Sequence, residues 1–320
     1  MRVSVLVPVY NAARYIERCA CSLLSQSYPH IEYIFVDDGS TDDSIDRLHD
    51  IIAQYPERRV TLRRNATNSG IACVRNQLLE LATGDYVYFV DSDDYIVPNA
   101  ITTLVNTAQE TGADIVRCQY FEEKGTSSVT VANNAFSSKM RLLADAVRGS
   151  RTVDSLWKLF IRRTLFTLNS LRFAKGINVC EDYVMSVKLF YYARLVVDLP
   201  QPLYHYCVSS NPQSLTKDTP TAIRDRDKAI DCVVDFLKEK DIYAQLANDV
   251  NIRVLICKQG YLLNPHCFNL QRYMTFHPEA NSAYRQLPYA RRERLLFWLA
   301  EHHLTLPLRI LHTLRRLKEQ

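Results

Sequence analysis

The sequence predicts an α/β fold: a mainly parallel sheet flanked by helices, followed by a helical C-terminal extension. Two observations predict it. Short apolar runs rich in β-branched residues alternate with segments of helical periodicity over the first 120 residues, and this alternation is typical of βαβ units with right-handed crossovers. After residue 215 the apolar periodicity is helical. We therefore expect an α/β domain over residues 1–215 and a helical extension over residues 216–320.

The expected elements follow one another along the chain. Each strand is an apolar run closed by turn residues, and strands are expected at 3–9, 32–36, 60–62, 86–90 and 114–118. Apolar residues three and four positions apart predict the intervening helices at 12–25, 42–52, 70–81 and 98–110. The Ser-, Thr- and Asn-rich segment 125–134 indicates a loop or hairpin. Further helices are expected at 140–148, 182–192, 225–240 and 246–263.

Charge is distributed unevenly along the chain. Hydrophobic residues make up 47% of the sequence and charged residues 23%, a composition that excludes a disordered chain. The net charge is +4, but residues 285–320 hold eight Arg or Lys against three acids, a local charge of +5. We expect an anionic partner, where there is one, to meet this C-terminal tail.

Cysteine content and hydropathy indicate the compartment. The nine cysteines form no C-x-x-C pair, and their odd number leaves no complete disulfide framework, which favours a reducing environment. The apolar run at 3–9 is too short for a signal peptide, and no stretch approaches the roughly 20 apolar residues that span a bilayer. The sequence therefore predicts a cytoplasmic protein.

Polar clusters occur where three of the predicted strands end. These clusters are Tyr10-Asn11, Asp37-Asp38 and the acidic run 91–94. Ligands of open α/β sheets bind at the carboxyl ends of the strands. We therefore expect side chains far apart in the sequence to meet at one edge of the sheet.

The run 91–94 begins Asp-Ser-Asp. Two carboxylates two residues apart, Asp91 and Asp93, suit a hard cation such as Mg²⁺ or Mn²⁺. A cation with few protein ligands keeps positions that a diphosphate can fill, and it neutralises charge on a leaving phosphate. The alternative is a solvated acidic loop.

Two further segments admit both a structural and a functional interpretation. In the run 37–42, Ser40 or Thr41 fits a helix N-cap, and an aspartate there can also accept the N3–H of a pyrimidine base. Gly70 permits close backbone approach at a helix start. Arg75 can pair with an aspartate of the acidic run or with a nucleotide, unless it is a surface arginine.

Together these motifs resemble the ordered signature of glycosyltransferase family 2. The motifs are Pro8-Val9-Tyr10-Asn11, 37–42, Asn68-x-Gly70-x4-Arg75-Asn76, Gly84-Asp85-Tyr86 and 91–94. The resemblance implies a GT-A fold, a nucleotide-diphosphate sugar donor and inversion by single displacement. It is tight over residues 1–120, the implied nucleotide-sugar-binding half, and looser over 121–215, the implied acceptor-side half.

The resemblance also implies roles for individual residues. The donor would be held by Pro8, Tyr10, Asn11, Asp38, Asn68, Gly70, Arg75, Asp91 and Ser92. Asp38 would face the base, Asp91 would lie by the ribose and metal, and Asp93 would be the principal ligand of Mn²⁺ or Mg²⁺. The implied donor is a UDP-hexose or UDP-N-acetylhexosamine. The implied acceptor is a hydroxyl of a glycan or lipid-linked molecule in cell-surface polysaccharide synthesis.

The family's general base is a carboxylate in a Glu-Asp pair that opens a helix, and Glu181-Asp182 fits this pattern. Inversion needs a base on the acceptor side of the sugar, so Asp182 is assigned this role with Glu181 as its reserve. The alternative is two acids stabilised by a helix dipole. Trp157 and Lys158, together with Glu181, are the other expected acceptor-side residues.

The sequence departs from the family pattern near residue 207. Cys207 stands where relatives often have an arginine, while Ser214 matches the pattern, and Leu78 replaces a common glycine. The resemblance therefore assigns no arginine from this loop to the diphosphate. His205 is a candidate replacement, with packing as its alternative role.

The C-terminal tail predicts a location, and two rival functions remain. Leu308, Leu311 and Leu314 share a stripe next to Arg309, His312 and Arg316, behind an apolar patch at 295–299. Such a helix can lie on an anionic membrane, giving a peripheral protein, or can pack on its own domain. A catalytically inactive nucleotide-sugar-binding partner remains an alternative, as does a sugar nucleotidyltransferase, although residues 10–15 lack its Gly-rich basic loop. No G-x-G-x-x-G or nucleic-acid-binding module occurs.

Overall fold

The computed structural model describes residues 1–149, 155–208, 219–264 and 266–318, with side chains up to residue 313. The first predicted strand forms as β1, Val3–Val9, and the second as β2, Ile31–Asp37. Every residue of both strands is buried. Strands covered on both faces have continuous apolar runs because neither face meets water.

A single sheet runs through the chain in the order β3-β2-β1-β4-β8-β6-β9-β5. The strands β3 (Arg59–Arg64), β2, β1 and β4 (Tyr86–Phe89) are parallel neighbours. The second half is mixed: β6 pairs with β9 in parallel, β8 lies antiparallel between β4 and β6, and β5 and β7 pair antiparallel to β9 and β6. Their bounds are β5 Tyr95–Ile96, β6 Ile115–Lys124, β7 Ser127–Val131, β8 Leu159–Arg162 and β9 Val196–Cys207. The predicted α/β class with a mainly parallel sheet is confirmed.

Side chains alternate between the two faces of the sheet. Val3, Val5 and Val7 of β1 pack against the helices of one face, which are α1 (Ile16–Leu24), α2 (Ser44–Ile52) and α4 (Ala100–Thr111). Leu6 of the same strand points to the other face. On that face lie α3 (Ile71–Leu81), α5 (Lys139–Arg148) and α7 (Glu181–Tyr192), and α8 (Pro220–Glu239) and α9 (Tyr243–Lys258) pack on α7 and α5.

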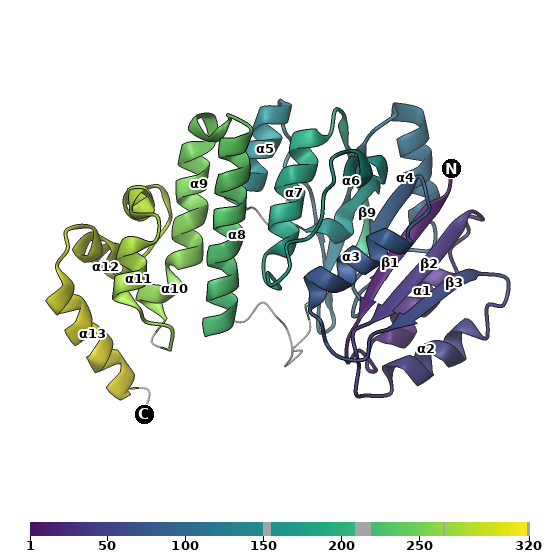
Figure 1. Cartoon of the computed structure of the whole chain (residues 1–320), viewed down its shortest axis with the longest axis horizontal. Coiled ribbons are helices and arrows are strands. Elements are labelled where there is room, and N and C mark those ends of the chain that lie inside the picture. The colour runs from purple at the N-terminus through teal and green to yellow at the C-terminus, as the bar shows by residue number, and fades with distance from the viewer. Residues whose placement is uncertain (150–154, 209–218, 265, 319–320) are drawn as a thin grey trace.

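The C-terminal helices extend the molecule away from the sheet (Figure 1). α8 and α9 share the core of the α/β part, since Ile230, Val234 and Val250 belong to the same buried cluster as Leu6. A separate cluster unites the helices beyond them. The remaining elements are η1 Leu156–Lys158, α6 Thr164–Leu168, α10 Gly260–Leu263, α11 Leu270–Thr275, η2 Pro278–Gln286, α12 Arg291–Glu301 and α13 Thr305–Lys318.

Several expectations about single elements are refined. The segment 125–134 forms a hairpin of β6 and β7, and the predicted helix 246–263 is divided into α9 and α10 at Gln259. The division of the chain at residue 215 stays a prediction. Among the helices of the described residues, none has the length and apolar character needed to cross a bilayer.

Candidate active site

The ends of β1, β2 and β4 bring three polar clusters to one edge of the sheet. The three strands are parallel neighbours, and the backbone N–H of Asp38 donates to the carbonyl of Val9 at 2.8 Å. Val90, which follows β4, donates to Leu6 of β1 at 3.0 Å. The residues that follow these strands therefore start from a common edge, as the sequence predicts.

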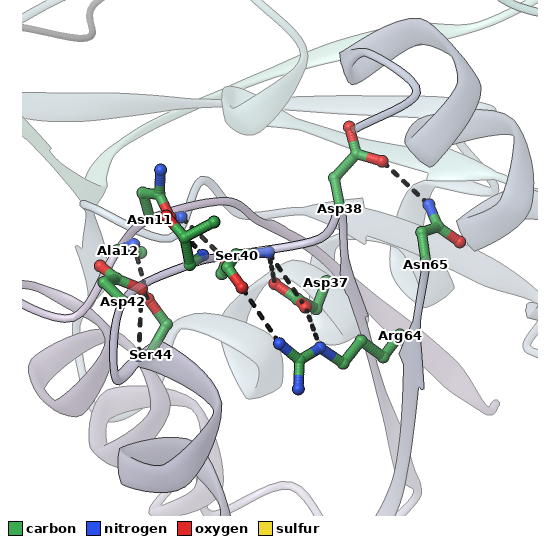
Figure 2. Close-up of polar contacts among 10 residues, drawn as sticks. Asn11, Ala12, Asp37, Asp38, Ser40, Asp42, Ser44, Arg64 and Asn65 are labelled. Atoms are coloured by element: carbon green, nitrogen blue, oxygen red, sulfur yellow. Dashed lines mark hydrogen bonds and ion pairs between the residues drawn. The ribbon is translucent and has the colours of Figure 1, made fainter. Parts of the chain in front are cut away.

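Side chains join the loops that follow β1 and β2 (Figure 2). Asn11 has a left-handed backbone with φ of 46°, and its Oδ1 accepts from the Thr41 N–H at 2.9 Å. In return, the Asn11 N–H donates to Ser40 Oγ at 2.9 Å, and the Ala12 N–H donates to Ser44 Oγ at 2.7 Å. Asn11 therefore fixes the shape of this edge, and it leaves Tyr10, which is 44% exposed, beside it.

Asp38 is buried and holds the loop that leads into α3. Its Oδ1 accepts from the Ser69 N–H at 2.9 Å, from Ser69 Oγ at 2.7 Å and from Asn65 Nδ2 at 2.9 Å. Its Oδ2 accepts from the Gly70 N–H at 2.9 Å. Each carboxylate oxygen offers about two acceptor positions, so Oδ1, with three donors, is fully occupied, whereas Oδ2 has one donor. Its contact with a base stays a prediction, and Oδ2 is the oxygen with an acceptor position left for a base N–H.

Two other predicted donor-binding residues lie in or next to this loop. Gly70 has a φ of 88°, and a Cβ there would collide with the side-chain amide of Asn178. Both facts require glycine at this position. Asn68 is exposed, whereas Pro8 is buried within β1 opposite Val36.

Asp37 is fully buried and stabilises the loop that follows β2. Its carboxylate accepts from the Ser40 N–H and pairs with Arg64 Nε at 3.2 Å. Arg64 also donates to the Ser40 carbonyl at 3.0 Å (Figure 2). The carboxylate pair at the end of β2 therefore avoids repulsion, because Asp37 binds an arginine and Asp38 binds backbone and side-chain donors.

Arg75 of α3 connects acids from distant parts of the chain. Its guanidinium is buried between Phe89 and Phe173, with Cζ 6.0 and 5.7 Å from the two ring centres. Nη2 lies 3.3 Å from Asp91 Oδ1, and Nη1 lies 2.7 Å from Glu181 Oε1 and also contacts Asp182. The acidic run and the Glu-Asp pair that opens α7 therefore contact the same guanidinium.

The acidic run 91–94 carries uncompensated negative charge. Burial and then the charge of Asp91 raise the pKa of Asp93 to about 6. Burial and the charges of Asp93 and Asp91 also raise the pKa of Asp94 well above its ordinary value. Only Asp91 of the three forms an ion pair within the described residues. Such a cluster favours a bound cation.

The donor set at Asp91 and Asp93 fits Mg²⁺ or Mn²⁺, which prefer carboxylate oxygens. Within the described residues, no group of three or more Asp, Glu, His or Cys side chains is arranged to hold a metal ion. A cation at this pair would therefore take its remaining ligands from water and from an anionic ligand. Ser92, between the two aspartates, is partly buried.

We expect Asp93→Asn to stabilise the metal-free protein. A carboxylate whose folded pKa lies near 6, above its value of 3.8 in an unfolded chain, opposes folding at pH 7. That cost is absent below the unfolded pKa and complete above the folded pKa. After allowance for solvent screening, the free energy of unfolding at pH 7 should rise by about 1–2 kcal/mol, and the gain should vanish near pH 4. Urea denaturation at both pH values, with EDTA present, measures this, and no gain at pH 7 contradicts it.

The end of β9 is attached to the acidic run, a feature that sequence reasoning missed. Tyr204 Oη donates to Asp94 Oδ2 at 2.7 Å and accepts from the Asp91 N–H at 3.1 Å. The Cys207 N–H donates to Asp94 Oδ1 at 2.7 Å. Asp94 is therefore a structural acid. The only signal in the sequence is that the run has one more aspartate than a cation pair needs.

The two expected acceptor-side residues before β8 lie in the core. Trp157 is buried and stacks on Tyr204 and Tyr206, with ring centres 4.6 and 5.3 Å apart. Lys158 is fully buried, with Nζ 5.9 Å from the centre of the Tyr120 ring. Trp157 therefore packs against β9 and Lys158 lies beside β6, and their contact with an acceptor stays a prediction. Ser214, which matches the family pattern, lies outside the described residues.

Comparisons with known proteins agree with this geometry. The chain is 32% identical over 222 residues to the uncharacterized glycosyltransferase EpsJ of Bacillus subtilis, an alignment that covers 67% of this chain and 63% of EpsJ. It is 31% identical over 220 residues to poly(ribitol-phosphate) beta-glucosyltransferase of Bacillus spizizenii, covering 68% of this chain and 34% of that protein. The chain thus spans less than two thirds of these relatives.

A solved structure shares the fold over nearly the whole chain. S. aureus TarS 1–349 in complex with UDP-GlcNAc superposes with a TM-score of 0.71 at 21% identity, covering 95% of this chain and 92% of that one. The sequence pattern of glycosyl transferase family 2 matches residues 4–167, just over half of the chain. The chain belongs to glycosyl transferase family 2.

Proposed function

We propose that this chain is an inverting glycosyltransferase that uses a UDP-hexose or UDP-N-acetylhexosamine. The acceptor is a hydroxyl of a glycan or lipid-linked molecule in cell-surface polysaccharide synthesis. The observation that carries the proposal is the contact of Arg75 with both Asp91 and the Glu181-Asp182 pair. This contact supports the proposal because Asp91, which with Asp93 suits a cation, and Asp182, which suits a base, contact the same guanidinium. The relative named for poly(ribitol-phosphate) supports a polymer acceptor.

Different residues of the chain would have different roles in the reaction. Tyr10 and Asp38 would receive the base, and Asp91 and Asp93 would hold Mn²⁺ or Mg²⁺. Bound by these two aspartates, the ion would supply positive charge for the donor diphosphate. Asp182 would accept the proton of the attacking hydroxyl on the face of the sugar opposite the nucleotide. Glu181 and Arg75 would hold Asp182 in place, because Arg75 contacts both acids.

The exposure of the two α7 acids supports the choice of base. The Asp182 side chain is 21% exposed and that of Glu181 is 10% exposed. Burial raises the pKa of Glu181, although Arg75 opposes the shift. A base must reach a hydroxyl that arrives from solvent, and Asp182 is the more accessible of the two.

The test is release of UDP from a panel of UDP-sugars in the presence of Mn²⁺ and a polysaccharide or lipid-linked acceptor fraction. At least one donor should give acceptor-dependent turnover, and EDTA should remove it. Stabilisation by UDP with Mn²⁺, but no turnover with any donor, would instead support a catalytically inactive binding partner. Formation of a UDP-sugar from UTP and a sugar phosphate would support a nucleotidyltransferase.

We also propose that the protein acts in the cytoplasm, at the inner face of the cytoplasmic membrane. α12, α13 and the connection between them expose apolar side chains, namely Leu295, Trp298, Leu304, Leu306, Ile310 and Leu311. The exposed cations Arg291, Arg292 and Arg309 lie on the same two helices. Exposed aromatic and aliphatic groups next to cations suit an anionic lipid interface. Leu308 is buried, so α13 also packs on its own domain, and the side chains of Leu314 and Arg316 lie outside the described residues.

Replacing Trp298 with glutamate should release the protein from lipid. Trp298 is 42% exposed on α12, so an acid there removes apolar contact and adds repulsion without disturbing the core. Sedimentation with vesicles of anionic lipid should show a partition coefficient at least about 10-fold lower. The matched control is Leu168→Glu, at an 81% exposed leucine of the α/β part. Equal binding by the two variants would contradict the membrane proposal.

A further inference from the structure

A second arginine, Arg18 of α1, contacts the acidic run at a different residue from Arg75. Arg18 of α1 is exposed, and its Nη2 donates to the backbone carbonyl of Asp93 at 3.0 Å and to Cys207 Sγ at 3.0 Å. Its Cζ lies 4.5 Å from the centre of the Tyr95 ring. α1, the acidic run and the end of β9 therefore meet at this guanidinium.

The Arg18 guanidinium is held without being neutralised. Its acceptors are a carbonyl and a thiol, and among the described residues no carboxylate lies within ion-pair distance of it. Burial raises the pKa of the Cys207 thiol to about 11, so the sulfur is uncharged at neutral pH. Arginine carries five N–H donors, and the contacts to Asp93 and Cys207 use one nitrogen. The remaining N–H donors are available to an anion.

Aromatic stacking orients Arg18. The Tyr95 ring beneath it stacks on His205 with ring centres 4.1 Å apart, and His205 stacks on Phe121 at 4.6 Å. His205 Nδ1 also lies 2.7 Å from Glu123 Oε1. This stack positions the guanidinium beside Asp93, and it explains His205 as a supporting residue. An arginine fixed on an aromatic face loses little freedom on binding a ligand.

We propose that Arg18 binds the diphosphate of the donor and stabilises the nucleoside diphosphate as it leaves. The inference rests on the proposed function, because that function places a diphosphate at Asp91 and Asp93. Arg18 supplies from α1 the positive charge that position 207, a cysteine, lacks. A planar guanidinium suits the paired oxygens of a phosphate.

The test compares UDP binding by Arg18→Met and by the wild-type chain, using titration calorimetry in excess Mn²⁺. The variant should bind UDP about 10- to 100-fold more weakly, as expected for loss of a charge-assisted contact. Its affinity for uridine, followed by ligand-detected NMR, should change less than about 2-fold, because uridine has no phosphate. A purely structural arginine would affect both ligands alike. The matched control is Arg47→Met on α2, an exposed arginine paired with Asp43.

Moving the positive charge from position 18 to position 207 gives a second test. Arg18→Met combined with Cys207→Arg should recover about 10-fold or more of the lost UDP affinity, since position 207 lies 3.0 Å from the guanidinium it replaces. Unchanged UDP affinity in Arg18→Met, or an equal loss for UDP and uridine, would overturn the inference. Wild-type protein that fails to bind UDP would overturn both this inference and the proposed function. Selective loss of UDP in a protein without turnover would support Arg18 and count against the function.

Discussion

Arg75→Met should lower the free energy of unfolding by about 3–5 kcal/mol, the range found when one partner of a buried ion pair is removed. The variant leaves Glu181, Asp182 and Asp91 close together without the cation that all three contact. Methionine retains most of the side-chain volume between Phe89 and Phe173, so the loss reports mainly on charge and hydrogen bonding. Urea denaturation at pH 7 measures the effect.

Two further variants isolate the role of the guanidinium at position 75. Arg75→Lys keeps the charge but loses the forked donors, so it should fall between wild type and methionine. Arg63→Met, at an exposed position of β3, should change stability by less than about 0.5 kcal/mol. A loss below about 1 kcal/mol for Arg75→Met would mean that the three acids do not depend on this cation.

Asp182→Asn should lower kcat by about 10²–10⁴-fold, the contribution of a general base. Asparagine preserves the shape of the side chain and removes its ability to take a proton. Donor binding should be nearly unchanged, because Asp182 would act on the acceptor side. Steady-state kinetics of UDP release and titration with UDP measure the two quantities separately.

The reserve residue gives the matched comparison for Asp182. Glu181→Gln should affect kcat less, because Glu181 is more enclosed than Asp182 and its Oε1 accepts a hydrogen bond from Arg75. Full turnover by Asp182→Asn would remove this residue as the base. A larger loss of kcat in Glu181→Gln would then transfer the role to Glu181.

The nucleotide-side half of the fold could be predicted because its signals are local. β1 and β2 are apolar at nearly every position, and the polar residues that follow them mark the strand ends. The parallel order of β2, β1 and β4 then brings Asp38, Asp91 and Asp93 to one edge. The sequence allowed two partners for Arg75, an aspartate of the acidic run or a nucleotide, and the structure pairs it with Asp91.

The acceptor-side half could not be predicted because its signals are long-range. β9 contains Pro200 and Pro202, which argue against a strand, and the structure accommodates them with register shifts opposite Cys118 to Tyr120. β8 is a four-residue strand whose partners are far away in the chain. The burial of Trp157 follows from its stacking on β9, so the sequence did not indicate this burial either.

The roles of individual polar side chains depend on partners that the sequence does not reveal. Asp38 has the spacing of a base-binding residue, yet its carboxylate also accepts four hydrogen bonds from residues 65–70, three of them at Oδ1. Arg18 gives no signal at all, because its contact with Cys207 joins positions 189 residues apart. Motif spacing locates the edge of the sheet, whereas packing decides which atoms remain free there.

The central claim is that acids distant in the sequence surround one cation and one diphosphate at the ends of β1, β2 and β4. Crystals grown with UDP and Mn²⁺ test it through the anomalous signal of manganese. The predicted result is a single ion bound by Asp93 beside Asp91, with the uracil at Tyr10 and Asp182 facing the open side of the ion. Manganese or UDP bound in a cavity that excludes Asp93, or one separated from Asp182, would contradict the claim.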